Sequence, residues 1–151
     1  MSSHDIVYPT IVLDKPATGT ALWTGRILSG LAALALFADS LGKLVQAQPV
    51  IDGTLALGYP RDSVLMLGVI LFTCVLAYVV PRTSVLGAIL LTAYLGGAVA
   101  THVRVESPLF THVLVPTYVA AFVWGGLLLR DARLRALFLP WSRRDRGVVA
   151  S

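Results

Sequence analysis

The sequence predicts an all-α integral membrane protein, a four-helix bundle with both termini in the cytoplasm. Hydrophobic residues make up 56% of the 151-residue chain, charged residues make up only 13%, and the apolar residues gather in long runs. An average soluble domain has about twice that charged fraction, and this chain lacks the polar residues needed to cover a soluble surface. We therefore expect the outer surface of the folded chain to face lipid.

Four apolar segments are expected to cross the membrane. They cover about residues 21–44, 63–80, 83–102 and 109–129, and together they form one transmembrane domain over residues 21–130. Their lengths are close to the roughly 20 residues that an α-helix needs to span about 30 Å of hydrocarbon. Pro81 ends the second segment sharply, because proline has no amide hydrogen to donate within a helix.

Three other segments are expected outside the spans. Residues 1–20 are mixed and polar and predict a flexible N-terminal tail. Residues 47–62 are too short to cross the bilayer, and we expect a brief amphipathic helix in the outer interface there. Residues 131–151 mix arginines with leucines and Trp141, which predicts a basic amphipathic tail. This tail either rests on the inner leaflet or is solvated; beside apolar spans, an anionic membrane surface suits its charge better than nucleic acid.

The distribution of basic residues predicts the orientation. If both termini lie on one side, that side receives nine basic residues and the other side receives only three, which are Lys43, Arg61 and Arg104. Cytoplasmic loops of membrane proteins carry the excess of lysine and arginine. Both termini are therefore expected in the cytoplasm, with the protein a multi-pass component of the inner (plasma) membrane.

Small residues predict how the helices pack. In lipid, helices associate where small residues let their backbones approach closely. The third span has such a row in Ala88, Thr92, Gly96 and Ala100, with Gly97 beside it, the fourth has Thr117, Ala121 and Gly125, and the first has Gly25, Ser29 and Ala33. We expect these rows to serve helix packing. The alternative for Gly96 and Gly97 is a place where a ligand ring slides against the backbone.

Several polar residues are expected to meet at the outer end of the spans. They are Asp39 and Lys43 after the first span, Tyr94, His102 and Arg104 in the third, and Glu106 and His112 before the fourth. Ionisable groups at membrane depth are costly, so they point to function or to a specific partner. Asp39 and Lys43, spaced i,i+4, are expected to pair with each other. Arg104 then requires Glu106 or Asp39 as its acid.

This polar cluster permits several kinds of chemistry. His102 and His112 could pass protons, a carboxylate could accept them, and Arg104 or Lys43 could hold an anionic or carbonyl-bearing head group. Pro116 cannot donate to the carbonyl of His112, which predicts a kink there. The ten-residue spacing of the two histidines is not a recognised zinc pattern, and we expect no metal site. An ion-pair network that only fixes the helices is the structural alternative.

Three stretches resemble the DoxX-like family of small bacterial four-helix membrane proteins. They are the run Ala-Asp-Ser-Leu-Gly-Lys-Leu at residues 38–44, Leu-Gly-Tyr-Pro at 57–60, and the longer signature that begins Leu-Gly-Ala-Ile-Leu-Leu-Thr-Ala-Tyr over residues 86–104. The resemblance covers about residues 25–130. It implies a four-helix bundle and a link, through the wider DoxX group, to membrane oxidoreductase complexes, including a thiosulfate:quinone oxidoreductase subunit.

Three functions remain open from the sequence. The leading one is an accessory or ligand-binding subunit of a membrane redox or stress-related complex, with a quinone or lipid-like ligand. The second is a membrane enzyme that acts on a small lipophilic substrate through a histidine–carboxylate pair, and the third is a structural or assembly factor. Cys74 is the single cysteine, so no cysteine pair exists for thiol exchange. Membrane lipids, a redox partner protein and a second copy of the chain are the partners considered, and nucleic acid is not expected.

Overall fold

The computed structural model describes residues 19–131 and residue 134. This part of the chain is helical. Its elements are α1 (Gly19–Leu44), α2 (Gln48–Ala56), α3 (Asp62–Val79), α4 (Ser84–Arg104), the π-helical turn η1 (Leu109–Val113) and α5 (Val115–Arg130). Four segments are long and apolar enough to cross a membrane, namely α1, α3, α4 and the combined stretch Leu109–Arg130.

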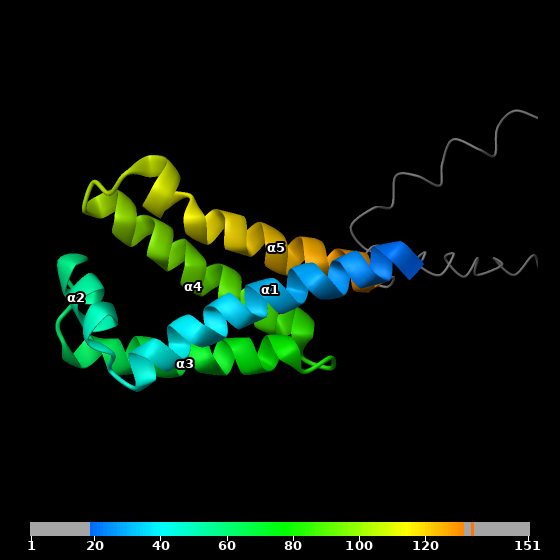
Figure 1. The fold of residues 1–151 in the computed structure, drawn as a ribbon, viewed down its shortest axis with the longest axis horizontal. Coiled ribbons are helices and arrows are strands. Elements are labelled where there is room, and N and C mark those ends of the chain that lie inside the picture. The colour runs from blue at the N-terminus through cyan, green and yellow to red at the C-terminus, as the bar shows by residue number, and fades with distance from the viewer. Residues whose placement is uncertain (1–18, 132–133, 135–151) are drawn as a thin grey trace, which may run out of the picture.

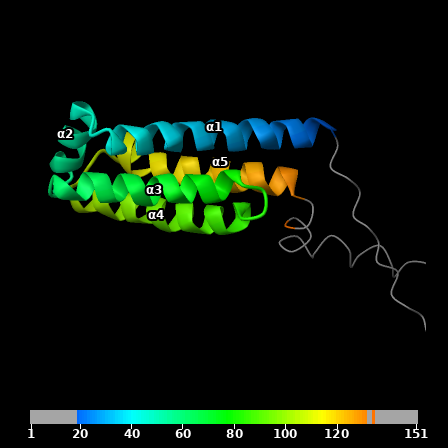
Figure 2. The ribbon, with the colours of Figure 1, turned by 90° about the horizontal axis from the view of Figure 1, so that it is seen from below.

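The four long segments pack side by side, and each contacts two neighbours. α1 lies against α3 and α5, and α4 lies against the other side of the same two helices. α1 begins and α5 ends at the same end of the molecule, which we call the terminal end (Figures 1 and 2). The short helix α2 lies at the opposite end, where α1 and α4 diverge (Figure 1). We call this the cavity end.

The outward faces of the long helices are apolar. Leu65, Met66 and Val69 of α3 are exposed, as are Leu86 and Ile89 of α4. A soluble helix places polar residues on such a face, whereas lipid-facing helices carry apolar ones. This arrangement, together with the lengths of the helices, identifies a membrane-embedded protein.

The helices approach most closely towards the terminal end. A Cβ atom on Gly126 of α5 would lie 2.4 Å from Ser29 Oγ and 2.7 Å from the Ser29 backbone nitrogen of α1. A Cβ on Gly87 of α4 would lie 2.2 Å from the backbone nitrogen of Tyr78 in α3. The buried Tyr78 hydroxyl also hydrogen-bonds to Ser29 Oγ at 2.9 Å and to the Val123 carbonyl at 3.0 Å. The Tyr78 hydroxyl thus links α1, α3 and α5 at this end.

The small-residue rows on the third and fourth spans do not make these close contacts. Ala88 is buried, but Gly96, Gly97 and Gly125 have open space where a Cβ would stand. The other members, which are Thr92, Ala100, Thr117 and Ala121, are exposed. This corrects the packing prediction for Gly96, Gly97 and Gly125 within the chain. The rotation of α4 turns Leu91 and Leu95 into the core and Gly96 and Gly97 away from it, while Thr92 Oγ1 accepts a hydrogen bond from Trp124 Nε1 of α5 at 2.8 Å.

Three helices finish at the cavity end with the same backbone motif. In each, the residue after the C-cap has a left-handed conformation: Gln46 after α1 (φ 52), Gly58 after α2 (φ 81) and Glu106 after α4 (φ 53). The next amide then bonds back to the helix, as when Ser107 N–H donates to the His102 carbonyl at 3.0 Å. This is the Schellman motif, in which glycine is the usual left-handed residue. Gln46 and Glu106 occupy that position without the freedom of glycine.

The observed helix bounds differ from the expected spans at a few points. α1 begins at Gly19, so the helix includes the last two residues of the expected tail, and α4 continues to Arg104. The fourth span is interrupted at Leu114, between η1 and α5, rather than being one regular helix. The rest of the expected N-terminal tail and nearly all of the C-terminal tail lie outside the described residues.

Candidate ligand-binding site

A cavity of about 1050 Å³ lies at the cavity end. α1 stays in contact with α3 here, since a Cβ on Gly68 would lie 2.7 Å from Lys43 Cβ, so the cavity forms on the other side of α1. It is lined by residues of α1, α2, α3, α4, η1 and the start of α5. Its inner part is apolar, with Leu36, Ala98 and Val119 among the residues that line it, and the polar groups gather nearer the helix ends.

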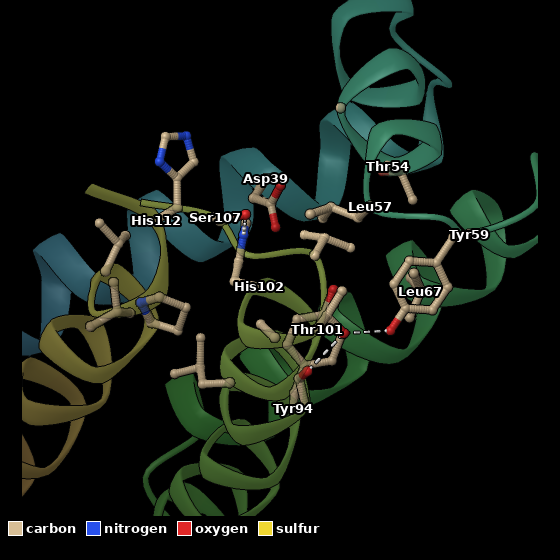
Figure 3. Close-up of a pocket in the computed structure, with 18 of the residues that line it drawn as sticks. Asp39, Thr54, Leu57, Tyr59, Leu67, Tyr94, Thr101, His102, Ser107 and His112 are labelled. Atoms are coloured by element: carbon tan, nitrogen blue, oxygen red, sulfur yellow. Dashed lines mark hydrogen bonds between the residues drawn. The ribbon is translucent and has the colours of Figure 1, made fainter. Parts of the chain in front are cut away.

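Six of the seven residues expected in the polar cluster line this cavity. They are Asp39, Lys43, Tyr94, His102, Glu106 and His112. These residues are far apart in sequence, but α1 and α4 end at the same end of the molecule. The space between the two diverging helices forms one cavity, which the residues line. The structure therefore places these six residues along one cavity, and Figure 3 shows Asp39, Tyr94, His102 and His112 around it.

Asp39 and Lys43 form an ion pair, as their i,i+4 spacing predicts. Lys43 Nζ donates to Asp39 Oδ1. The lysine side chain is 12% exposed and the aspartate side chain 44% exposed. The lysine ammonium is thus already neutralised where it meets the cavity.

Arg104 does not join the cavity, which corrects its expected pairing with Glu106 or Asp39. Its Nη2 atom donates to the carbonyl oxygen of Leu57 at 2.8 Å. The left-handed Gly58 makes room for the guanidinium, because a Cβ at that position would lie 3.2 Å from Arg104 Nη2. In the described chain, Asp39–Lys43 is the ion pair that forms. Arg104 instead ties the end of α2 to the end of α4.

A second tie between these segments involves residues that sequence reasoning missed. Thr101 Oγ1 donates to the Gly97 carbonyl at 2.9 Å, so the Tyr59 hydroxyl, 2.8 Å away, is the donor in its contact with Thr101. Both side chains line the cavity (Figure 3). The Gly-Tyr-Pro turn was visible in the sequence, but its α4 partner lies 42 residues away and depends on tertiary structure.

The two histidines lie at the rim of the cavity, close to each other. Their ring centroids are 5.8 Å apart. His102 Nδ1 lies 3.1 Å from Ser107 Oγ, and His112 Nδ1 lies 2.8 Å from Thr111 Oγ1. Within residues 19–131, neither imidazole hydrogen-bonds to a carboxylate. The histidine–carboxylate pair considered for an enzyme is therefore not assembled in this structure.

Gly97 and Tyr94 shape the middle of the cavity. Gly97 lines it and has no atom within 4 Å of a would-be Cβ, so the missing side chain leaves open volume. Gly96, its neighbour on α4, is equally open but does not line the cavity. At Gly97, this contrast favours a place for a ligand over a helix-packing contact.

The Tyr94 hydroxyl has no hydrogen-bond partner in the part of the chain that the structure describes, which leaves it available to a bound molecule.

Among the described residues, no group of three histidine, cysteine or acidic side chains could hold a metal ion. The cavity is thus a hollow with an apolar interior and a polar rim at one end of four apolar helices.

The sequence model of the DoxX-like family matches residues 27–126, which is more than half of the chain. The chain belongs to the DoxX-like family. That match spans the segments from α1 to α5 that enclose the cavity. Comparisons with curated proteins and with solved structures gave no match.

Proposed function

We propose that this DoxX-like protein is a binding protein for a membrane lipophile, held in the cavity between α1, α2, α4 and η1. The observation that supports this most is the open volume beside Gly97 within a cavity of about 1050 Å³. Cavities of this size, with apolar walls and a few polar groups, are typical of small-molecule sites. The apolar interior suits an acyl or prenyl chain, and the polar rim suits its head group.

We place binding ahead of acid–base catalysis. Hydroxyl groups, rather than carboxylates, contact the Nδ1 atoms of His102 and His112. A general base must lie within hydrogen-bond reach of the group it serves and is commonly oriented by a third group. The ties made by Arg104 and Tyr59 instead support α2 and its following turn as a wall of the site.

The proposal includes the orientation. Nine basic residues on the side of the termini against three on the other support cytoplasmic termini. In a four-helix bundle in the inner membrane, the cavity would then face the outer side. The redox link implied by the family resemblance supports a role as an accessory subunit of a membrane redox or stress-related complex, and a quinone matches the chemistry of the cavity.

A pair of glycine variants tests the proposal. Gly97→Leu puts a side chain into the cavity, while Gly96→Leu puts the same side chain on the same helix outside it. Leucine is also the better helix former by about 1 kcal/mol, so neither variant should unfold α4. We expect Gly97→Leu to lower monooleoylglycerol binding at least about tenfold, equivalent to about 1.4 kcal/mol. Gly96→Leu should bind like the parent protein.

Binding is measured by native mass spectrometry of the full chain released from an uncharged detergent, with thermal unfolding as the check on folding. Equal loss in both variants, or no binding by the parent protein, would argue against the cavity as a site and favour a structural or assembly role. Copurified small molecules from the gently extracted parent protein would identify the natural ligand.

A further inference from the structure

We infer that the cavity selects a lipophile with an uncharged head group and rejects the same chain with an anionic head. This inference rests on the proposed binding function and specifies its ligand class. It follows from which charged groups reach the cavity and from how each is paired.

The charges that line the cavity are two carboxylates and one ammonium group. They belong to Asp39, Glu106 and Lys43. Lys43 is bonded to Asp39, so its charge is already balanced. Glu106 has no ion-pair partner in the described chain and adds a negative charge at the rim. An anionic head group would therefore meet an excess of negative charge.

The cations that an anion would need point elsewhere. Arg104, at the end of α4, donates to the Leu57 carbonyl and does not line the cavity. The N-terminus of α5 does reach the cavity, and such a terminus can bind anions through its free amides. Pro116 lies in that first turn, however, and has no amide hydrogen to donate. No unpaired cationic side chain among the described lining residues remains to hold a phosphate.

The polar rim does offer partners to an uncharged head. The Tyr94 hydroxyl has no hydrogen-bond partner among the described residues, and Ser107 and the two imidazoles add groups that can donate or accept. An uncharged head with hydroxyl or carbonyl oxygens can use these groups without desolvating a charge, which is the large cost of burying an ion.

Three ligands with one oleoyl chain test the inference on the full-length protein. Monooleoylglycerol has an uncharged head, oleoyl lysophosphatidate an anionic head, and oleylamine a cationic head. At fixed ionic strength in an uncharged detergent, we expect monooleoylglycerol to bind at least about tenfold more tightly than lysophosphatidate, a difference of about 1.4 kcal/mol. Oleylamine should not bind more tightly than monooleoylglycerol, because its ammonium must be desolvated and the solvent-exposed Glu106 offsets only part of that cost.

The variant Asp39→Asn provides the sharper test. It leaves the Lys43 ammonium without its partner at the cavity, so the affinity for lysophosphatidate relative to that for monooleoylglycerol should rise at least about fivefold, or about 1 kcal/mol. The matched control is Asp52→Asn, on α2, since Asp52 accepts from Gln48 and does not line the cavity. It should change neither affinity.

The outcomes separate this inference from the proposed function. If monooleoylglycerol and lysophosphatidate bind the parent protein equally, or if Asp39→Asn leaves the preference unchanged, the charge selectivity is wrong while the binding function stands. Tighter binding of oleylamine than of monooleoylglycerol would also overturn it. If no oleoyl ligand binds, the proposed function itself fails.

Discussion

The two ends of this protein are built in opposite ways. At the terminal end, glycines bring backbones into contact, and the buried Tyr78 hydroxyl bonds to Ser29 of α1 and Val123 of α5. At the cavity end, α1 and α4 diverge around about 1050 Å³ of open space, and the polar side chains face that space. The helices are therefore tightly packed at the terminal end, whereas at the cavity end α1 still contacts α3 but is separated from α4 by open space.

The difference shows which parts of the molecule can serve binding. Protein interiors pack densely, and an unfilled volume forfeits contacts. The cavity end also holds Gln46 and Glu106 in a left-handed conformation that favours glycine. Strained backbone tends to occur at functional sites. Open volume and strain occur together at this end, whereas the terminal end has the contacts that stabilise the fold.

The largest effect that we predict is at the terminal end. Gly126→Ala would bring a methyl group within 2.7 Å of the Ser29 backbone nitrogen, and backbone cannot easily move away. We expect a loss of about 3 kcal/mol in stability, at the upper end of the usual range for overpacking. The measurement is thermal or denaturant unfolding of the purified protein in detergent.

Gly125→Ala is the matched control for that variant. It adds the same methyl group one residue earlier on α5, where no atom lies within 4 Å. Alanine stabilises a helix relative to glycine by about 0.5–1 kcal/mol, so this variant should be unchanged or slightly more stable. Similar destabilisation of both variants would contradict the tight packing of α1 against α5.

A smaller effect of opposite sign is expected at the cavity end. Glu106→Gly and Gln46→Gly each place glycine at a left-handed position, and the left-handed conformation costs other residues roughly 1–2 kcal/mol. Since glycine also gains freedom in the unfolded chain, we expect each variant to gain about 0.5–1 kcal/mol in stability. The two form a matched pair, because Glu106 lines the cavity and Gln46 does not. A loss of stability in both would show that the backbone there is not strained.

Much of the fold could be predicted from the sequence, because runs of apolar residues have a direct meaning in a bilayer. The short helix between the first two spans and the Asp39–Lys43 pair also followed from local patterns. Local spacing could not predict which face of α4 turns inward. Gly96, Gly97 and Gly125 were expected to pack, but the closest approaches belong to Gly126 and Gly87. Of the glycines expected to pack, Gly25 does contact α5.

The polar cluster was predicted in part for a similar reason. Topology alone places the ends of α1 and α4 at the same end of the molecule, so Asp39, His102 and His112 could be grouped from the sequence. The partner of Arg104 could not, because it is a backbone carbonyl of the turn after α2, 47 residues away. Backbone acceptors leave no trace in residue types, and the signal for them appears only when the chain is folded.

The most direct test of the account is to locate a bound lipophile. Monooleoylglycerol with a diazirine group on its chain would be photoactivated with the parent protein, and the labelled peptides mapped by mass spectrometry. The account predicts adducts on the cavity segments of α1 and α4, around Leu36 and residues 93–98, that excess unlabelled monooleoylglycerol removes. Adducts confined to lipid-facing residues such as Met66 and Ile89, unaffected by the competitor, would contradict the cavity as a binding site.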